Sequence, residues 1–144
     1  AGEQAVYVPV MATARPIIST AASTDYTLYA KDSGATILLA ANDCNVTLPS
    51  AEAGLHFTFI MAADYATAVS TVVQAAASED FFGALYGSSQ AESATADADV
   101  ATSGNTKVTF ASAALKGDIV QVCSDGTGWY TQAWAQVYSA ITFD

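Results

Sequence analysis

Short runs of β-favouring residues, separated by residues that form turns, constrain the fold of this chain more than any other feature. From Asp25 onward, stretches rich in Val, Ile, Leu, Phe and Thr are interrupted by Gly, Asn, Asp, Ser and Pro. Strands that recur about every 8–12 residues with such turns between them are typical of a sandwich or barrel. The sequence therefore predicts an all-β domain, an antiparallel β-sandwich or jelly-roll, with strands over 26–29, 37–39, 45–48, 55–61, 69–73, 81–86, 107–111, 118–123, 129–133 and 134–143.

The stretch 55–61 is the clearest single strand. Leu55, Phe57 and Phe59 alternate with more polar residues, and successive side chains of a strand point to opposite faces, so one aromatic-rich side faces inward. Residues 87–105 are almost all Ser, Ala, Thr, Gly, Asp and Glu, which predicts a long, exposed loop. We find no clean internal repeat and no heptad pattern.

The length of 144 residues is that of a single domain. We expect this domain over residues 21–144, preceded by an extended arm over residues 1–20. Alternating valines at the start of the chain suit strand pairing, whereas Pro9 and Pro16 suit only a sheet edge. Such an arm would add a strand at an edge or reach a neighbouring subunit.

The charge balance excludes several classes of partner. Four basic residues face 14 acidic ones, and the net charge is −10, so the chain cannot supply the clustered Lys and Arg that nucleic acid or an anionic membrane surface requires. No apolar run is long enough to span a bilayer, and the N-terminus lacks the basic start of a secretion signal. Charged residues make up only 12% of the chain, about half the usual fraction of roughly 25%. Because interface cores are depleted of charge, we expect an oligomer or an assembly.

Cys44 and Cys123 lie far apart in the sequence and form no CxxC pair. The favoured interpretation is two small, half-buried residues in strands, and the alternative is a single disulfide that closes a long loop. Zinc would need these cysteines together with His56, which is not a recognisable ligand spacing. We therefore predict no metal site and no cofactor.

The single histidine, His56, lies on the opposite face of its strand from Leu55 and Phe57 and is interpreted as a surface or interface group. A Ser-His-Asp set could be built only around it, and the chain has no GxSxG elbow, Walker loop or dinucleotide-binding glycine pattern. Carboxylate pairs such as Glu52 with Glu79 or Asp80 are open alternatives, but nothing raises one pair above another. We predict no catalytic residues and no enzyme activity.

Other candidate sites have a plain and a functional interpretation. Glu92, Asp97 and Asp99 could offer oxygen ligands to calcium, but a solvated acidic loop is preferred because the spacing is not that of an EF-hand. Asn45-Val46-Thr47 matches a glycosylation acceptor, which matters only in a eukaryotic secretory pathway.

Trp129, Tyr130 and Trp134 form an aromatic corner near the C-terminus. These side chains could provide a platform for sugar rings. The preferred interpretation is that the tryptophans fill the core or a seam between subunits.

Two segments resemble structural modules of tailed bacteriophage virions. Val46-Thr47-Leu48-Pro49, followed by residues 54–59, resembles a pattern in which VTLP, small residues and a glycine precede an aromatic strand. Residues 117–130 resemble the end of the same modules, with GD, a strand, SDGT and WY in order, and we expect 124–128 to be a hairpin loop. Between them, 72–75 and 80–83 resemble the connecting step, so the likeness covers about residues 25–130. It implies a β-sandwich or β-tulip-like domain, commonly a homotrimer.

The resemblance implies a capsid decoration, or cement, protein at the virion surface. Its partners would be copies of itself in a homotrimer and the major capsid protein, with the arm and the charge-poor surface making the contacts. The alternative is a receptor- or carbohydrate-binding module of a fibre or adhesin, which would use Trp129, Tyr130, Trp134 and the loop 87–105. A third hypothesis is a bacterial appendage subunit that donates its arm as a strand.

Overall fold

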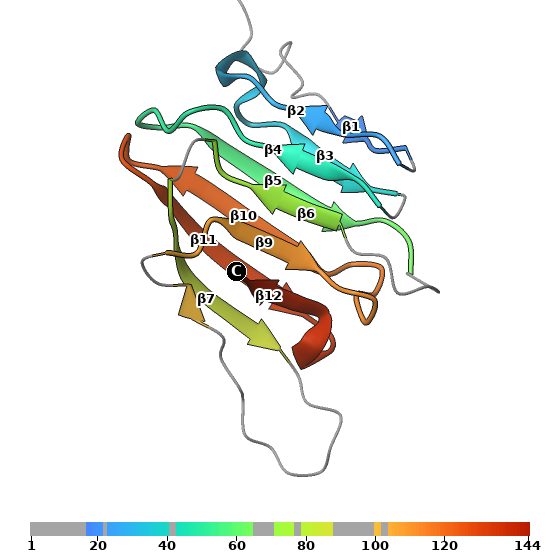
Figure 1. Ribbon diagram of the computed structural model, residues 1–144. Coiled ribbons are helices and arrows are strands. Elements are labelled where there is room, and N and C mark those ends of the chain that lie inside the picture. The colour runs from blue at the N-terminus through green and yellow to red at the C-terminus, as the bar shows by residue number, and fades with distance from the viewer. Residues whose placement is uncertain are drawn as a thin grey trace, which may run out of the picture.

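The computed structural model describes residues 17–21, 23–40, 43–64, 71–76, 79–87, 100–101 and 104–144. Within these residues the chain is all-β, as the sequence predicts, and its helices are short 3-10 turns (Figure 1). The elements are β1(Ile17–Ser19), β2(Tyr26–Thr27), η2(Ala30–Asp32), β3(Thr36–Leu39), β4(Asn45–Thr47), β5(His56–Met61), β6(Thr71–Gln74), β7(Phe81–Gly87), β8(Val100–Ala101), β9(Lys107–Phe110), β10(Ile119–Ser124), β11(Trp129–Ala135), η3(Tyr138–Ala140) and β12(Ile141–Phe143).

The strands form two sheets. The larger has the order β1-β3-β5-β10-β11-β7-β8, and the smaller has the order β12-β9-β6-β4-β2. Alternating residues of both sheets are buried, for example Phe57 and Phe59 in β5 and Val108 and Phe110 in β9, and they belong to one continuous hydrophobic cluster. The two sheets therefore share a single core.

The expectation of purely antiparallel pairing is wrong. β1-β3, β3-β5, β2-β4, β4-β6 and β11-β7 are parallel pairs, whereas β5-β10, β10-β11, β6-β9, β9-β12 and β7-β8 are antiparallel. Four of these parallel pairs, all except β11-β7, arise because the first six strands alternate between the sheets. After each strand in one sheet the chain forms a strand in the other sheet, and it then returns to the first sheet in the same direction.

This winding produces a structural repeat that the sequence pattern does not reveal. The backbone N–H of Ala40 donates to the hydroxyl of Thr20, and Asn45 N–H donates to Asp25 Oδ1, each across 20 residues. Ser23 Oγ donates to Asp43 Oδ2 across the same separation. Short polar side chains thus tie one turn of the winding to the next.

Several predicted boundaries change. Trp134 continues β11 instead of starting a new strand, and the last strand begins only at Ile141. The predicted loop 87–105 contains the short strand β8, which pairs with β7, while residues 88–99 lie outside the described part. Of the predicted arm, residues 1–16 also lie outside it, and Ile17–Ser19 forms the edge strand β1.

Candidate functional site

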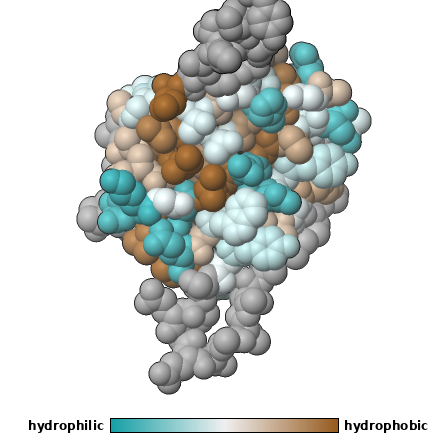
Figure 2. All heavy atoms as spheres, turned by 180° about the vertical axis from the view of Figure 1, so that it is seen from behind, coloured by the Kyte–Doolittle hydropathy of each residue, from teal (hydrophilic) through white to brown (hydrophobic). Residues whose placement is uncertain are grey.

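The most distinctive surface is the side of the larger sheet that faces away from the core. None of the residues that the structure describes on the strands of this face is Asp, Glu, Lys or Arg, although the chain carries a net charge of −10. Figure 2, which shows the molecule from behind the view of Figure 1, shows apolar side chains gathered in a band on this face. We call it the outer face, and it comprises Ile17, Ser19, Thr36, Leu38, His56, Thr58, Ile60, Phe82, Ala84, Tyr86, Ile119, Gln121, Cys123, Tyr130, Gln132 and Trp134.

Strand register arranges the centre of the outer face in three rows. Each row takes one residue from each of β5, β10, β11 and β7. The first is His56, Cys123, Tyr130 and Phe82; the second is Thr58, Gln121, Gln132 and Ala84; and the third is Ile60, Ile119, Trp134 and Tyr86. Aromatic residues therefore lie on both sides of a row that carries two amides.

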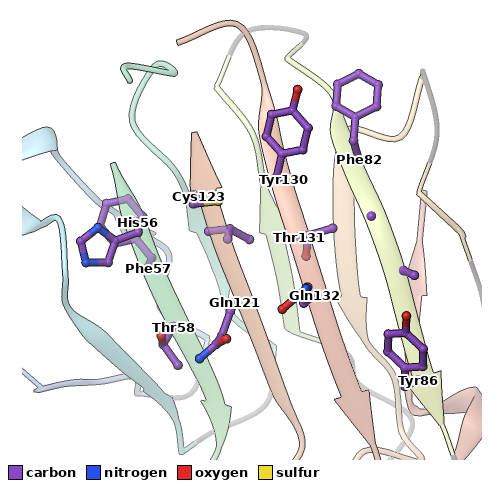
Figure 3. A pocket seen from close by; sticks show the side chains of 13 residues that line it. His56, Phe57, Thr58, Phe82, Tyr86, Gln121, Cys123, Tyr130, Thr131 and Gln132 are labelled. Carbon is purple, nitrogen blue, oxygen red and sulfur yellow. The ribbon is translucent and has the colours of Figure 1, made fainter. Parts of the chain in front are cut away.

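A concave groove follows these strands and encloses about 640 Å³. Its lining includes the amides of Gln121 and Gln132 together with Phe82, Tyr86 and Tyr130 (Figure 3). Tyr130 and Phe82 lie near one end of the groove, and Tyr86 lies near the other. The site is thus a trough with aromatic ends and a polar middle.

The aromatic side chains are paired across β7 and β11. The ring centroids of Phe82 and Tyr130 are 6.1 Å apart at an interplanar angle of 38°, and those of Tyr86 and Trp134 are 6.4 Å apart at 24°. Such offset arrangements are favourable for aromatic rings. Tyr86 and Tyr130 still expose 57% and 50% of their surfaces, so each pair presents ring surface to a ligand.

Asp125 fixes the orientation of Tyr130. Its carboxylate accepts hydrogen bonds from the backbone N–H and hydroxyl of Thr127, from Gly128 N–H and from the Tyr130 hydroxyl. These donors, with Thr127 first, lower the pKa of Asp125 from 3.8 to about 2. The hydrogen bond to the Asp125 carboxylate raises the pKa of Tyr130. Residues 125–128 join β10 to β11 in a hairpin, which agrees with the predicted loop 124–128 except that Ser124 still belongs to β10.

At the floor of the groove β7 lies close against β11. A Cβ atom at Gly83 would overlap the carbonyl oxygen of Thr131, so only glycine fits there. Ala84 follows and adds a single methyl group to the middle row. These small residues leave room between Phe82 and Tyr86.

The two tryptophans lie in different places: Trp129 fills the core, in line with the preferred interpretation, whereas Trp134 is exposed, as the alternative of an aromatic platform requires. Tyr130 and Trp134 lie on the outer face, but Trp129 is 0% exposed in the core, where its ring packs 6.0 Å from that of Phe57. Phe82 and Tyr86 take its place in the groove. The alternation of side chains along a strand could have identified the outward-facing aromatic residues. Trp129 and Tyr130 are neighbours in one strand, as are Phe81 and Phe82, so only one member of each pair faces outward.

The other candidate residues have structural explanations or lie elsewhere. Glu79 accepts hydrogen bonds from Trp129 Nε1–H and from Ala51 N–H, so its carboxylate links two parts of the fold. His56 lies on the outer face as expected, with Nδ1 3.2 Å from the carbonyl oxygen of Gly54. The candidate calcium ligands Glu92, Asp97 and Asp99 lie outside the described residues.

The two cysteines differ from the expectation that both are half-buried. Cys44 is buried and Cys123 is exposed on β10, and no disulfide joins them. Within the described ranges no three His, Cys, Asp or Glu side chains gather as they would around a metal ion. Nor does any helix there have the length and apolar character needed to cross a membrane.

Comparison with protein-family models, curated proteins and solved structures finds no match for this chain.

Proposed function

We propose that this protein is a capsid decoration protein that binds an assembled viral shell and stabilises it, as a homotrimer at the virion surface. The two sheets would form a β-sandwich or β-tulip-like module with the arm attached at its edge. The resemblance of residues 46–59 and 117–130 to virion modules supports this proposal.

The observation that carries the proposal is the apolar end of the outer face, at β1, β3 and β5. Ile17 exposes 69% of its surface, and Leu38 and Ile60 are also partly exposed on the same face. Uncharged apolar surface of this kind is characteristic of protein interfaces. A shell subunit that covered it would gain roughly 25 cal/mol per Å² of apolar area buried.

The edge strand offers a second contact. β1 is the last strand of its sheet among the described residues and pairs there only with β3. Open edges pair readily with another extended chain. β1 directly follows the predicted arm in the sequence, so we propose that the arm and the apolar end engage the same partner.

Light scattering and shell binding test the proposal together. We expect a concentration-independent trimer that co-sediments with shells assembled from the major capsid protein encoded in the same genome. Deleting residues 1–16 keeps β1 and should leave the trimer intact while weakening shell binding.

A pair of matched variants locates the contact. Ile17→Asp should weaken shell binding at least about tenfold, because it puts a charge into an apolar contact. The control, Thr27→Asp, is at an exposed strand position of the smaller sheet and should bind like the wild type. A monomer at every concentration, or equal binding by both variants, would refute the proposal.

A further inference from the structure

We propose that the groove of the outer face is a binding site for a neutral oligosaccharide. The proposal rests on one juxtaposition: the partly exposed ring of Phe82 and the exposed ring of Tyr130 at one end and the exposed ring of Tyr86 at the other, with the side-chain amides of Gln121 and Gln132 between them. It goes beyond shell attachment, which would use the β1, β3 and β5 end of the same face.

The dimensions suit a short, extended ligand. Phe82 and Tyr86 are four residues apart on one strand, which corresponds to about 13 Å at roughly 3.3 Å per residue. The groove volume of about 640 Å³ falls within the range of about 300–1,000 Å³ typical of small-ligand sites. An oligosaccharide lying along β7 and β11 would reach both aromatic ends.

The polar groups in the middle of the groove are available to a ligand. Gln121 and Gln132 are exposed cross-strand neighbours, and within the described part of the chain no hydrogen bond engages either side-chain amide. Each amide offers two donors and an acceptor. Sugar hydroxyl groups, which both donate and accept, match that combination.

The aromatic side chains at the two ends of the groove match the apolar faces of a sugar ring. A pyranose ring has apolar C–H faces that pack on flat aromatic side chains, and tyrosine adds a hydroxyl at its tip. The ring of Tyr86 is supported from behind by Trp134, and that of Tyr130 is held by Phe82 and Asp125. Because the rings are already oriented, little side-chain entropy is lost on binding.

The absence of charge on the outer face indicates a neutral ligand. An acidic or sulfated sugar would find no Lys or Arg among the outer-face residues. For a cationic ligand, the acidic group among the described residues that contacts the groove lining is Asp125, through Tyr130, and its carboxylate already accepts four hydrogen bonds. Burying an uncompensated charge is costly, so the groove selects against both.

A two-fold dimer of the chain would fit this part of the face less well. In a two-fold contact the same surface meets itself, and two concave surfaces would leave the groove empty and the amides of Gln121 and Gln132 without partners. Shape complementarity at interface cores approaches that of protein interiors. The shape of the groove therefore favours a small ligand over a two-fold dimer contact.

The test starts with the purified full-length protein on an array of neutral oligosaccharides, including glucans, galactans, mannans and N-acetylated chains. Sialylated and sulfated oligosaccharides serve as charged controls. We expect binding to a subset of the neutral compounds only. If no neutral compound binds at millimolar concentration, or if the charged controls bind as well, the proposal is overturned.

Two built-in reporters place the ligand in the groove. Trp134 is 43% exposed and Trp129 is buried, so the fluorescence change on binding should disappear in Trp134→Phe. Cys123 lines the groove and Cys44 is buried, so the oligosaccharide should slow alkylation of Cys123 alone. A ligand that leaves Cys123 fully reactive binds elsewhere and refutes the assignment.

Matched variants complete the test. Tyr86→Ala and Gln132→Ala should each weaken binding roughly five- to tenfold, with unchanged melting temperature because both side chains are exposed. The control, Tyr29→Ala, removes an exposed tyrosine outside the groove and should bind normally. Equal affinity in all three variants would overturn the proposal, and so would loss of the native trimer in Tyr86→Ala, which would assign the face to another copy of the chain.

Discussion

Trp129 donates a hydrogen bond from its indole Nε1 to Oε2 of Glu79, at 3.0 Å. The other oxygen of the same carboxylate accepts from Ala51 N–H at 2.8 Å. One carboxylate therefore fixes the largest buried side chain of the larger sheet and the loop before β5. The sequence offered Glu79 as a possible catalytic carboxylate, whereas these contacts give it a structural role.

Replacing Glu79 should destabilise the fold. Glu79→Ala leaves the Trp129 indole and the Ala51 N–H without their acceptor, and we expect a loss of about 2–4 kcal/mol in the free energy of unfolding. Urea denaturation followed by fluorescence measures it. Glu52→Ala, at an exposed position nearby, should change stability little. A Glu79→Ala protein as stable as this control would show that the two hydrogen bonds of Glu79 contribute nothing to the free energy of unfolding.

The depressed pKa of Asp125 predicts a specific acid sensitivity. The folded pKa is about 2, below the ordinary value of 3.8, so the ionised form is favoured in the folded state. Its stabilising contribution is present above about pH 4 and is lost as the pH falls through 2. NMR titration should place the Asp125 midpoint near 2, and the stability difference between wild type and Asp125→Asn should narrow over that range. Titration at the ordinary value would contradict the hydrogen-bond pattern of the hairpin loop.

Replacing Thr131 should stabilise the protein. Its hydroxyl is buried and has no hydrogen-bond partner among the described residues. Thr131→Val replaces the hydroxyl with a methyl group of similar size, and we expect the protein to gain roughly 1 kcal/mol because an unsatisfied polar group is removed. Thermal unfolding measures the gain, with Thr58→Val on the outer face as the control. A loss of stability would mean that the hydroxyl has a partner, such as a buried water.

The two cysteines should react at very different rates. Iodoacetamide should label Cys123 in the folded protein and reach Cys44 only after denaturation, since one thiol is exposed and the other buried. Mass spectrometry of tryptic peptides distinguishes them. If both thiols resisted alkylation even in urea until a reductant was added, the cysteines would be joined in a disulfide.

The strands could be predicted from the sequence where the alternation of residues is strong. Leu55 to Met61 and Ile119 to Cys123 show a period of two, and both stretches form central strands of the larger sheet. Strand pairing could not be predicted in the same way. Whether β3 meets β5 in parallel depends on contacts between residues far apart in sequence, and local β propensity is the same for both directions.

The groove was only partly predictable for a related reason. Tyr130 and Trp134 are recognisable as aromatic residues near a hairpin, but Phe82 and Tyr86 meet them only through the parallel pairing of β11 with β7. Gln121 and Gln132 carry no local signal at all, because an amide in a strand is usually a solvated side chain. Their relationship emerges from the register of the β10-β11 hairpin.

The alternation of the first strands between the two sheets also determines how the chain must fold. From β1 to β7 each strand lies in the sheet opposite to that of the strand before it. Two neighbouring strands of one sheet are therefore separated in the sequence by a strand of the other sheet. Among the described strands, β10 and β11 alone are hydrogen-bonded partners joined by a short loop. Loop-closure entropy must be lost before most contacts form, which slows folding. We therefore expect the two layers to assemble together around the β10-β11 hairpin, with neither layer formed before the other.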